Sequence, residues 1–120
     1  MAKRGSNKHR SVEQEDYIAK KISGVRSPSS GASDKEDGDV RTKLFLVECK
    51  TTGEYHKPAK SISIKLDDIE KIVDEAYAAN RVPVMALRIH NPQSPLADAD
   101  GNIDIMANLL KDWLYLDNLC

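Results

Sequence analysis

Two acidic residues and a lysine, Asp39, Glu48 and Lys50, have the types and the spacing needed for metal-assisted chemistry. Glu48 and Lys50 follow an apolar run at 44–47, and alternation along a strand places them on one face. Asp39 precedes this run, and residues 41–43 can form a turn that folds it back beside Glu48. Charges at the end of a buried strand are costly unless they pair or bind something. The pattern therefore predicts a site for a divalent cation.

The chemistry that such a site supports best is hydrolysis of a phosphodiester. This reaction needs a hydroxide nucleophile, neutralisation of charge in the transition state and help for the leaving oxygen, and carboxylate-bound metal ions provide all three. Mg²⁺ prefers oxygen ligands and keeps several waters, so Asp39, Glu48 and the main-chain carbonyl of Cys49 would suffice. Mn²⁺ is an acceptable substitute. Lys50 would orient or polarise the attacking water, or stabilise developing negative charge.

The surrounding pattern alternates helices and strands. Ser11 is a plausible N-cap for an amphipathic helix that stops near Gly24. After the strand at 44–50, Asp67 or Asp68 is expected to cap a second helix, which ends near residue 80. Residues 82–89 form another apolar strand, expected to run parallel to the strand at 44–50. This order predicts an α/β fold.

The remaining segments are less regular. Residues 51–60 are polar with two breakers, and residues 61–64 can form a short extended piece. Residues 98–104 superficially suggest a calcium loop, but Leu96 and Ala107 would then occupy its first and twelfth positions, where carboxylates are needed. We therefore interpret 98–104 as a turn. The apolar residues at 103–116 have helical spacing, although 113–116 could equally be a final strand, and they could also form a partner surface.

Length and cysteine usage limit the class of protein. A chain of 120 residues predicts one domain, here a flexible basic arm at 1–10 and a domain at 11–120, with its core at about 11–90 and a C-terminal extension at 91–120. Cys49 and Cys120 are too few for a disulfide framework, which indicates a reduced, intracellular protein. No apolar run suggests a membrane span or a secretion signal. We expect a cytoplasmic location.

Charge is distributed unevenly along the chain. Residues 1–26 hold seven basic and three acidic side chains, whereas residues 61–120 hold five basic and ten acidic ones. A basic end beside a carboxylate site suits a polyanion such as DNA. The alternative is that the first ten residues form a solubilising tail.

The ordered set of motifs resembles a known family. A helix carries Glu15, a Ser-Gly loop follows at 27–31, Gly38-Asp39-Val40 forms a turn, and an apolar strand ends in Glu48-x-Lys50. This order resembles the PD-(D/E)XK nuclease superfamily, and within it the archaeal and phage Holliday junction resolvases. The likeness covers roughly residues 11–90. Gly38 stands where the family nominally has proline, which is tolerated because only the turn is needed.

The resemblance implies a Mg²⁺-dependent structure-selective DNA endonuclease with a restriction-endonuclease-like αβββαβ core, a mixed central sheet flanked by helices. It also implies a homodimer that presents two active sites to a four-way junction. Glu15 would be the helix carboxylate, with Glu13 as its competitor, and Ser30 would contact the scissile phosphate. The basic residues expected to follow the DNA phosphates are Lys3, Arg4, Lys8, Arg10, Lys57 and Lys60.

Two other functions remain open at this stage. The same chemistry would serve a nicking or restriction-like endonuclease on ordinary duplex DNA. A catalytically silent DNA-binding module on the same fold is the second alternative, although it would not need Glu15, Asp39, Glu48 and Lys50 together. The structural alternative for these residues is a surface ion-pair cluster at a sheet edge.

Overall fold

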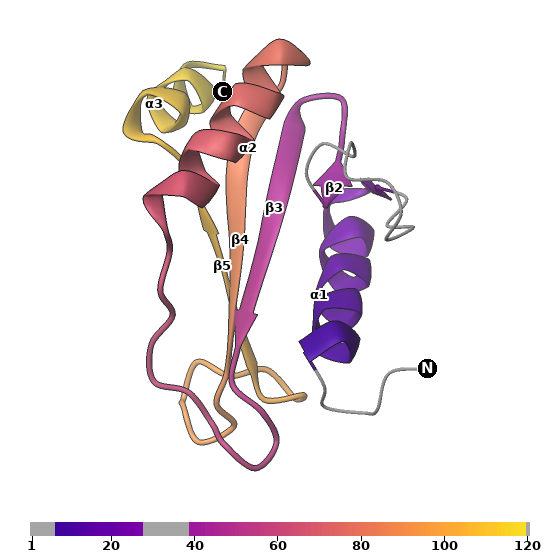
Figure 1. The fold of residues 1–120 in the computed structure, drawn as a ribbon, viewed down its shortest axis with the longest axis vertical. Helices are drawn as coiled ribbons and strands as arrows, with labels where there is room; N and C mark the ends of the chain where they lie inside the picture. The colour runs from indigo at the N-terminus through magenta and orange to yellow at the C-terminus, as the bar shows by residue number, and fades with distance from the viewer. Residues whose placement is uncertain (1–6, 28–38, 120) are drawn as a thin grey trace.

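The structure, a computed structural model, describes residues 7–27 and 39–119. A five-stranded mixed sheet carries three helices in an α/β arrangement (Figure 1). The elements in chain order are α1 (Asn7–Ile22), β1 (Val25–Arg26), β2 (Val40–Arg41), β3 (Phe45–Thr52), α2 (Leu66–Ala78), β4 (Val82–His90), β5 (Asn102–Ala107) and α3 (Leu110–Asn118).

The strands are hydrogen-bonded in the order β1-β2-β3-β4-β5. β3 and β4 are parallel, as the sequence predicts for two strands joined by a helix, and the other neighbours are antiparallel. β3 pairs with β4 along its full length, from Phe45 opposite Val82 to Thr52 opposite Ile89. β2 pairs with β3 at two positions, Val40 with Val47 and Arg41 with Leu46, so most of β3 extends past the end of β2.

The sheet has an apolar cluster on each face, and these clusters fix the two main helices. Because side chains alternate along a strand, Val47 packs toward α1 and Leu46 packs toward α2. The α1 cluster consists of Ile18, Val40, Val47, Val84 and Ala86. The α2 cluster consists of Leu46, Ile72, Ala76, Met85 and Leu87. β3 is therefore covered by a helix on either face (Figure 1).

The helix starts differ from the predictions. α1 begins at Asn7, so Ser11 lies inside the helix and residues 7–10 of the expected flexible arm are helical. Contacts within the fold explain the extension: Arg10 lies 3.9 Å from Glu54, and Gln14 is buried against the sheet. α2 begins at Leu66 with Lys65 as its N-cap, so neither Asp67 nor Asp68 caps it. Both aspartates lie instead in its first turn.

The C-terminal segment was the least well predicted. Residues 102–107 form strand β5 against β4, so the sheet extends beyond the expected core boundary at residue 90. The helical spacing that Ile103 shares with Met106 is therefore misleading. Trp113 and its neighbours belong to α3 rather than to a final strand. Residues 61–64 form no strand.

Candidate functional site

Asp39 is held beside the middle of β3 by its own backbone and side chain. Its N–H donates to the carbonyl of Val47 at 2.7 Å, and its carbonyl accepts from the N–H of Ser27 at 2.9 Å. Its Oδ2 atom accepts from the N–H of Cys49 at 2.7 Å. The Asp39 carboxylate therefore accepts a main-chain hydrogen bond from β3 just beyond the positions that pair with β2. Asp39 thus lies next to the strand that carries Glu48.

Glu48 and Lys50 lie on the face of β3 that α2 covers. Lys50 Nζ is 3.9 Å from Glu48 Oε2, and the side chain of Glu48 is 15% exposed. Cys49 points to the opposite face, where it packs against the α1 cluster. Burial, followed by the charges of Asp39, Glu15 and Glu48, raises the pKa of the Cys49 thiol. The thiol is therefore neutral, and its main-chain carbonyl stays the group of interest.

The three predicted carboxylates affect one another. Burial raises the pKa of Glu48 to about 7, and the negative charge of Asp39 adds to this shift. Burial also raises the pKa of Asp39, and the Cys49 N–H opposes that shift by stabilising the carboxylate. The pKa of Glu15 is raised by burial and then by Asp39. Carboxylates that repel one another in a partly buried place are relieved by a cation.

Glu13 and Glu15, the two candidates for the helix carboxylate, lie in different positions relative to the site. Glu15 lies close enough to Asp39 to feel its charge, whereas Glu13 is exposed on another side of α1. Gln14 lies between them and is almost fully buried. Its Nε2 donates to the carbonyl of Lys50 at 2.9 Å and to that of Ala86 at 3.0 Å. This amide fixes α1 across β3 and β4, and so fixes the position of Glu15.

Two cations that the motif does not contain, Arg26 and Lys71, lie at or near the carboxylates. Arg26 on β1 binds Glu15 at 3.1 Å and Asp16 at 3.2 Å. Lys71 on α2 lowers the pKa of both Asp39 and Glu48 through its charge. In the sequence, Arg26 comes two residues after Gly24, the predicted end of the first helix. Its position there is the one sequence signal that could have pointed to it.

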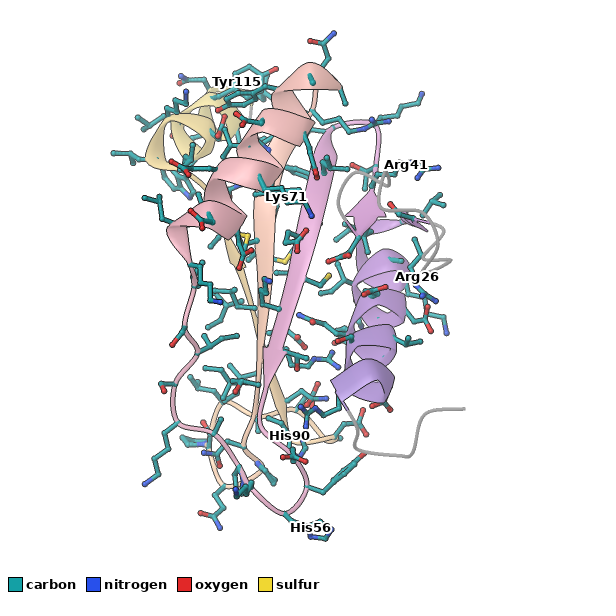
Figure 2. All side chains as sticks on the ribbon, viewed as in Figure 1. Arg26, Arg41, His56, Lys71, His90 and Tyr115 are labelled. Atoms are coloured by element: carbon teal, nitrogen blue, oxygen red, sulfur yellow. The ribbon has the colours of Figure 1, made fainter. Side chains whose placement is uncertain are left out.

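A further acid, Asp68 on α2, was predicted as a helix cap but binds Lys50. Its Oδ2 lies 3.1 Å from Lys50 Nζ, closer than Glu48 does. Helical spacing provides the signal that could have indicated this, because Asp68, Lys71 and Glu75 form one stripe beside the buried Ile72. Figure 2 shows Lys71 on α2, on the side that faces β3.

The structure describes only some of the predicted DNA-contacting residues. Lys3, Arg4 and Ser30 lie outside the described residues, and Lys8 belongs to the first turn of α1. The side chain of Arg10 is only 12% exposed and lies 3.9 Å from Glu54. Lys57 and Lys60 are exposed on the loop that follows β3.

The donor atoms at the site suit a hard cation. Among residues 7–27 and 39–119, no three His, Cys, Asp or Glu side chains converge in the manner of an all-protein metal cage. Asp39 just before β2, Glu48 on β3 and the main-chain carbonyl of Cys49 would offer a cation oxygen ligands only. Mg²⁺ accepts such a set because it keeps several of its waters. Asp39 retains its Oδ1 atom for this role, since the Cys49 N–H occupies Oδ2.

A cavity of about 590 Å³ lies elsewhere, between α1, the ends of β3 and β4 and the 98–102 turn. Its walls include Arg10, Glu13, Arg88, His90 and Asp100, but none of the four predicted catalytic residues. The candidate site, between β2, β3 and α2, thus lies outside this cavity.

Comparison of the chain with protein-family models, with curated proteins and with solved structures gives no match. The interpretation of the site therefore depends on its own residues and geometry. Within the part of the chain that the structure describes, α1, α2 and α3 each lack the length and apolar character needed to cross a membrane.

Proposed function

We propose that this protein is a Mg²⁺-dependent DNA endonuclease that cuts four-way junctions. One observation carries the proposal: Asp39 is bonded to β3 beside Glu48, both carboxyls have raised pKa values, and Lys50 shares the face of Glu48. Groups with perturbed pKa values that lie together on one surface are candidates for chemistry. A surface ion-pair cluster would instead balance acids with bases and leave them exposed.

The order of elements supports a restriction-endonuclease-like core. A helix, three strands, a helix and a strand follow one another from α1 to β4, which is the αβββαβ order. β5 and α3 would then be additions at the C-terminal end. The positions of the acids support the same proposal, since Asp39 directly precedes β2 and the Glu-x-Lys pair lies on β3.

Each residue of the site would have its own role in the reaction. Asp39, Glu48 and the Cys49 carbonyl would hold Mg²⁺ or Mn²⁺, which supplies charge neutralisation and acidifies water when bound. Lys50 would donate a hydrogen bond to the attacking water or to a phosphate oxygen, and Asp68 restrains its ammonium at 3.1 Å. Glu15 would add negative charge at the edge of the site, positioned by Arg26.

A homodimer would place two such sites on one junction. β5 is an edge strand of the sheet, and α3 with its C-cap residue exposes large apolar side chains. These side chains are Leu110, Trp113, Leu114, Tyr115 and Leu119. A nine-residue helix is not stable on its own, and an exposed apolar face of this kind favours contact with a second copy. Twofold symmetry then yields paired nicks in opposing strands.

The test compares a four-way junction with a linear duplex of the same sequence, each incubated with the protein and Mg²⁺. We expect the junction to be cut at symmetric positions and the duplex to be spared. Equal cutting of both would favour the nicking or restriction-like alternative.

Substitutions at the site test which residues the cleavage reaction needs. Asp39→Asn and Lys50→Ala should abolish cleavage and leave junction affinity within a few-fold, because the groups act on the reaction rather than on general phosphate binding. Asp67→Asn, at an exposed acid on α2, is the matched control and should cut normally. Normal cutting by both site variants would refute the assignment. Binding without cutting by the unaltered protein would indicate a silent module.

A further inference from the structure

The charged stripe of α2 lies against the charged face of β3. Asp68, Lys71 and Glu75 follow the helical repeat and border the buried Ile72 and Ala76. α2 connects two parallel strands, so it runs opposite to β3, and the contact of Asp68 with Lys50 sets their alignment. One turn further along α2, Lys71 comes level with Glu48, because three helical residues rise about 4.5 Å and two strand residues about 6.6 Å.

The two lysines are held differently. Lys50 lies between Asp68 at 3.1 Å and Glu48 at 3.9 Å, so its ammonium is drawn toward α2. Lys71 contacts Glu75 at 4.0 Å, and its side chain is 59% exposed. An ion pair at that distance, with an exposed lysine, contributes little, and the ammonium can be transferred to another anion.

Electrostatics supports the same placement. Lys71 is near enough to Asp39 and Glu48 for its positive charge to act on both carboxylates, as that of Lys50 does. The Glu-x-Lys motif contains only Lys50. Figure 2 shows Lys71 on the side of α2 that faces β3.

We propose that Lys71 is a second catalytic cation, which leaves Glu75 to contact a non-bridging oxygen of the scissile phosphate. This inference rests on the proposed nuclease function. A phosphodiester that approaches Asp39, Glu48, Asp68 and Glu75 meets four acids, so it needs more positive charge than Lys50 can supply. Lys50 is restrained and suits the positioning of water, whereas Lys71 is free to move toward the substrate.

The first measurement is single-turnover cleavage of a four-way junction at saturating protein with Mg²⁺. Lys71→Met should slow cleavage by about 100-fold, the effect of removing one donor to a transition-state oxygen, with junction affinity within a few-fold. Lys71→Arg keeps the charge and should retain most of the rate. Lys65→Met removes an exposed lysine at the start of the same helix and should cut normally. Normal cutting by Lys71→Met would overturn the proposal.

The second measurement needs no cleavage, so it separates this inference from the nuclease proposal. Mn²⁺ binding to the protein alone should become a few-fold tighter in Lys71→Met, because a positive charge beside the carboxylates is removed. Lys65→Met should bind Mn²⁺ as the unaltered protein does. A lysine that is merely solvated would change neither quantity. If the unaltered protein does not cut, the nuclease proposal fails, and unchanged Mn²⁺ affinity in Lys71→Met would then also refute a role for Lys71 at the site.

Discussion

Two charged clusters on the same sheet show opposite ways of burying charge. On β4 and β5, Arg88 and Asp104 are register partners and make two hydrogen bonds, from Nε at 2.8 Å and from a terminal nitrogen at 3.0 Å. Their side chains are 7% and 19% exposed. One positive charge meets one negative charge with fork geometry, so the pair is satisfied within the fold.

On β2 and β3, the balance is different. Asp39, just before β2, and Glu48, on β3, are like charges whose pKa values are raised by burial. The lysines near them are shared with Asp68 and Glu75. Such an arrangement costs stability at neutral pH, and a bound cation would repay that cost. Matched buried charges therefore stabilise the fold, whereas unmatched buried charges favour the binding of a ligand.

The largest effect is expected from breaking the matched pair. Arg88→Met leaves the Asp104 carboxylate partly buried without its partner and removes a cation from the ring of Tyr17, 4.9 Å away. We expect a loss of about 3–5 kcal/mol in the free energy of unfolding at pH 7, measured by urea denaturation. The double variant Arg88→Met/Asp104→Leu should recover most of this loss. A single variant that loses less than about 1 kcal/mol would show that the pair is not structural.

The second effect is a gain in the free energy of unfolding, expected from a substitution in the unmatched cluster of Asp39 and Glu48. The pKa of Glu48 rises from 4.5 to about 7 in the folded protein, so the native state binds this proton more tightly than the unfolded chain does. Stability from this group is complete below about pH 4.5, declines as the pH rises toward 7, and stays lost above that. Glu48→Gln removes the penalty and should raise unfolding free energy at pH 8 by about 2–3 kcal/mol.

The measurement is urea denaturation of Glu48→Gln and of the unaltered protein at pH 5 and pH 8. The two proteins should differ at pH 8 and converge toward pH 5. Glu70→Gln, at an exposed position on α2, is the control and should leave the difference between pH values unchanged. A Glu48→Gln variant that is less stable at pH 8 would show that Glu48 is satisfied within the fold, as Asp104 is.

Much of this contrast could be expected from the sequence. The apolar run before Glu48 predicts β3, alternation predicts the shared face of Glu48 and Lys50, and a short turn predicts Asp39 beside them. These are local patterns, and the structure confirms the elements that they predict. The parallel pairing of β3 with β4 followed from the helix between them.

The residues that α2 contributes could not be assigned in this way. Asp68 looks like a helix cap in sequence, but its carboxylate is used by Lys50, eighteen residues earlier in the chain. Which turn of α2 meets which residue of β3 depends on how Ile72 and Ala76 pack against the sheet. Strand β5 was missed for a similar reason, because pairing with β4 overrides the helical spacing of its apolar residues.

The smallest effect is expected from an ion pair that resembles the Arg88 pair in length but differs in its surroundings. Arg26 lies 3.2 Å from Asp16, whose side chain is 60% exposed, and also lies 3.1 Å from Glu15. Asp16→Asn should therefore change unfolding free energy by less than about 0.5 kcal/mol, since water replaces the lost contact at little cost. Urea denaturation beside Arg88→Met provides the measurement. A loss above 1 kcal/mol would mean that the distance between the charges decides what an ion pair on this sheet contributes to stability, rather than burial and the matching of charges. The contrast between the two clusters would then lose its physical basis.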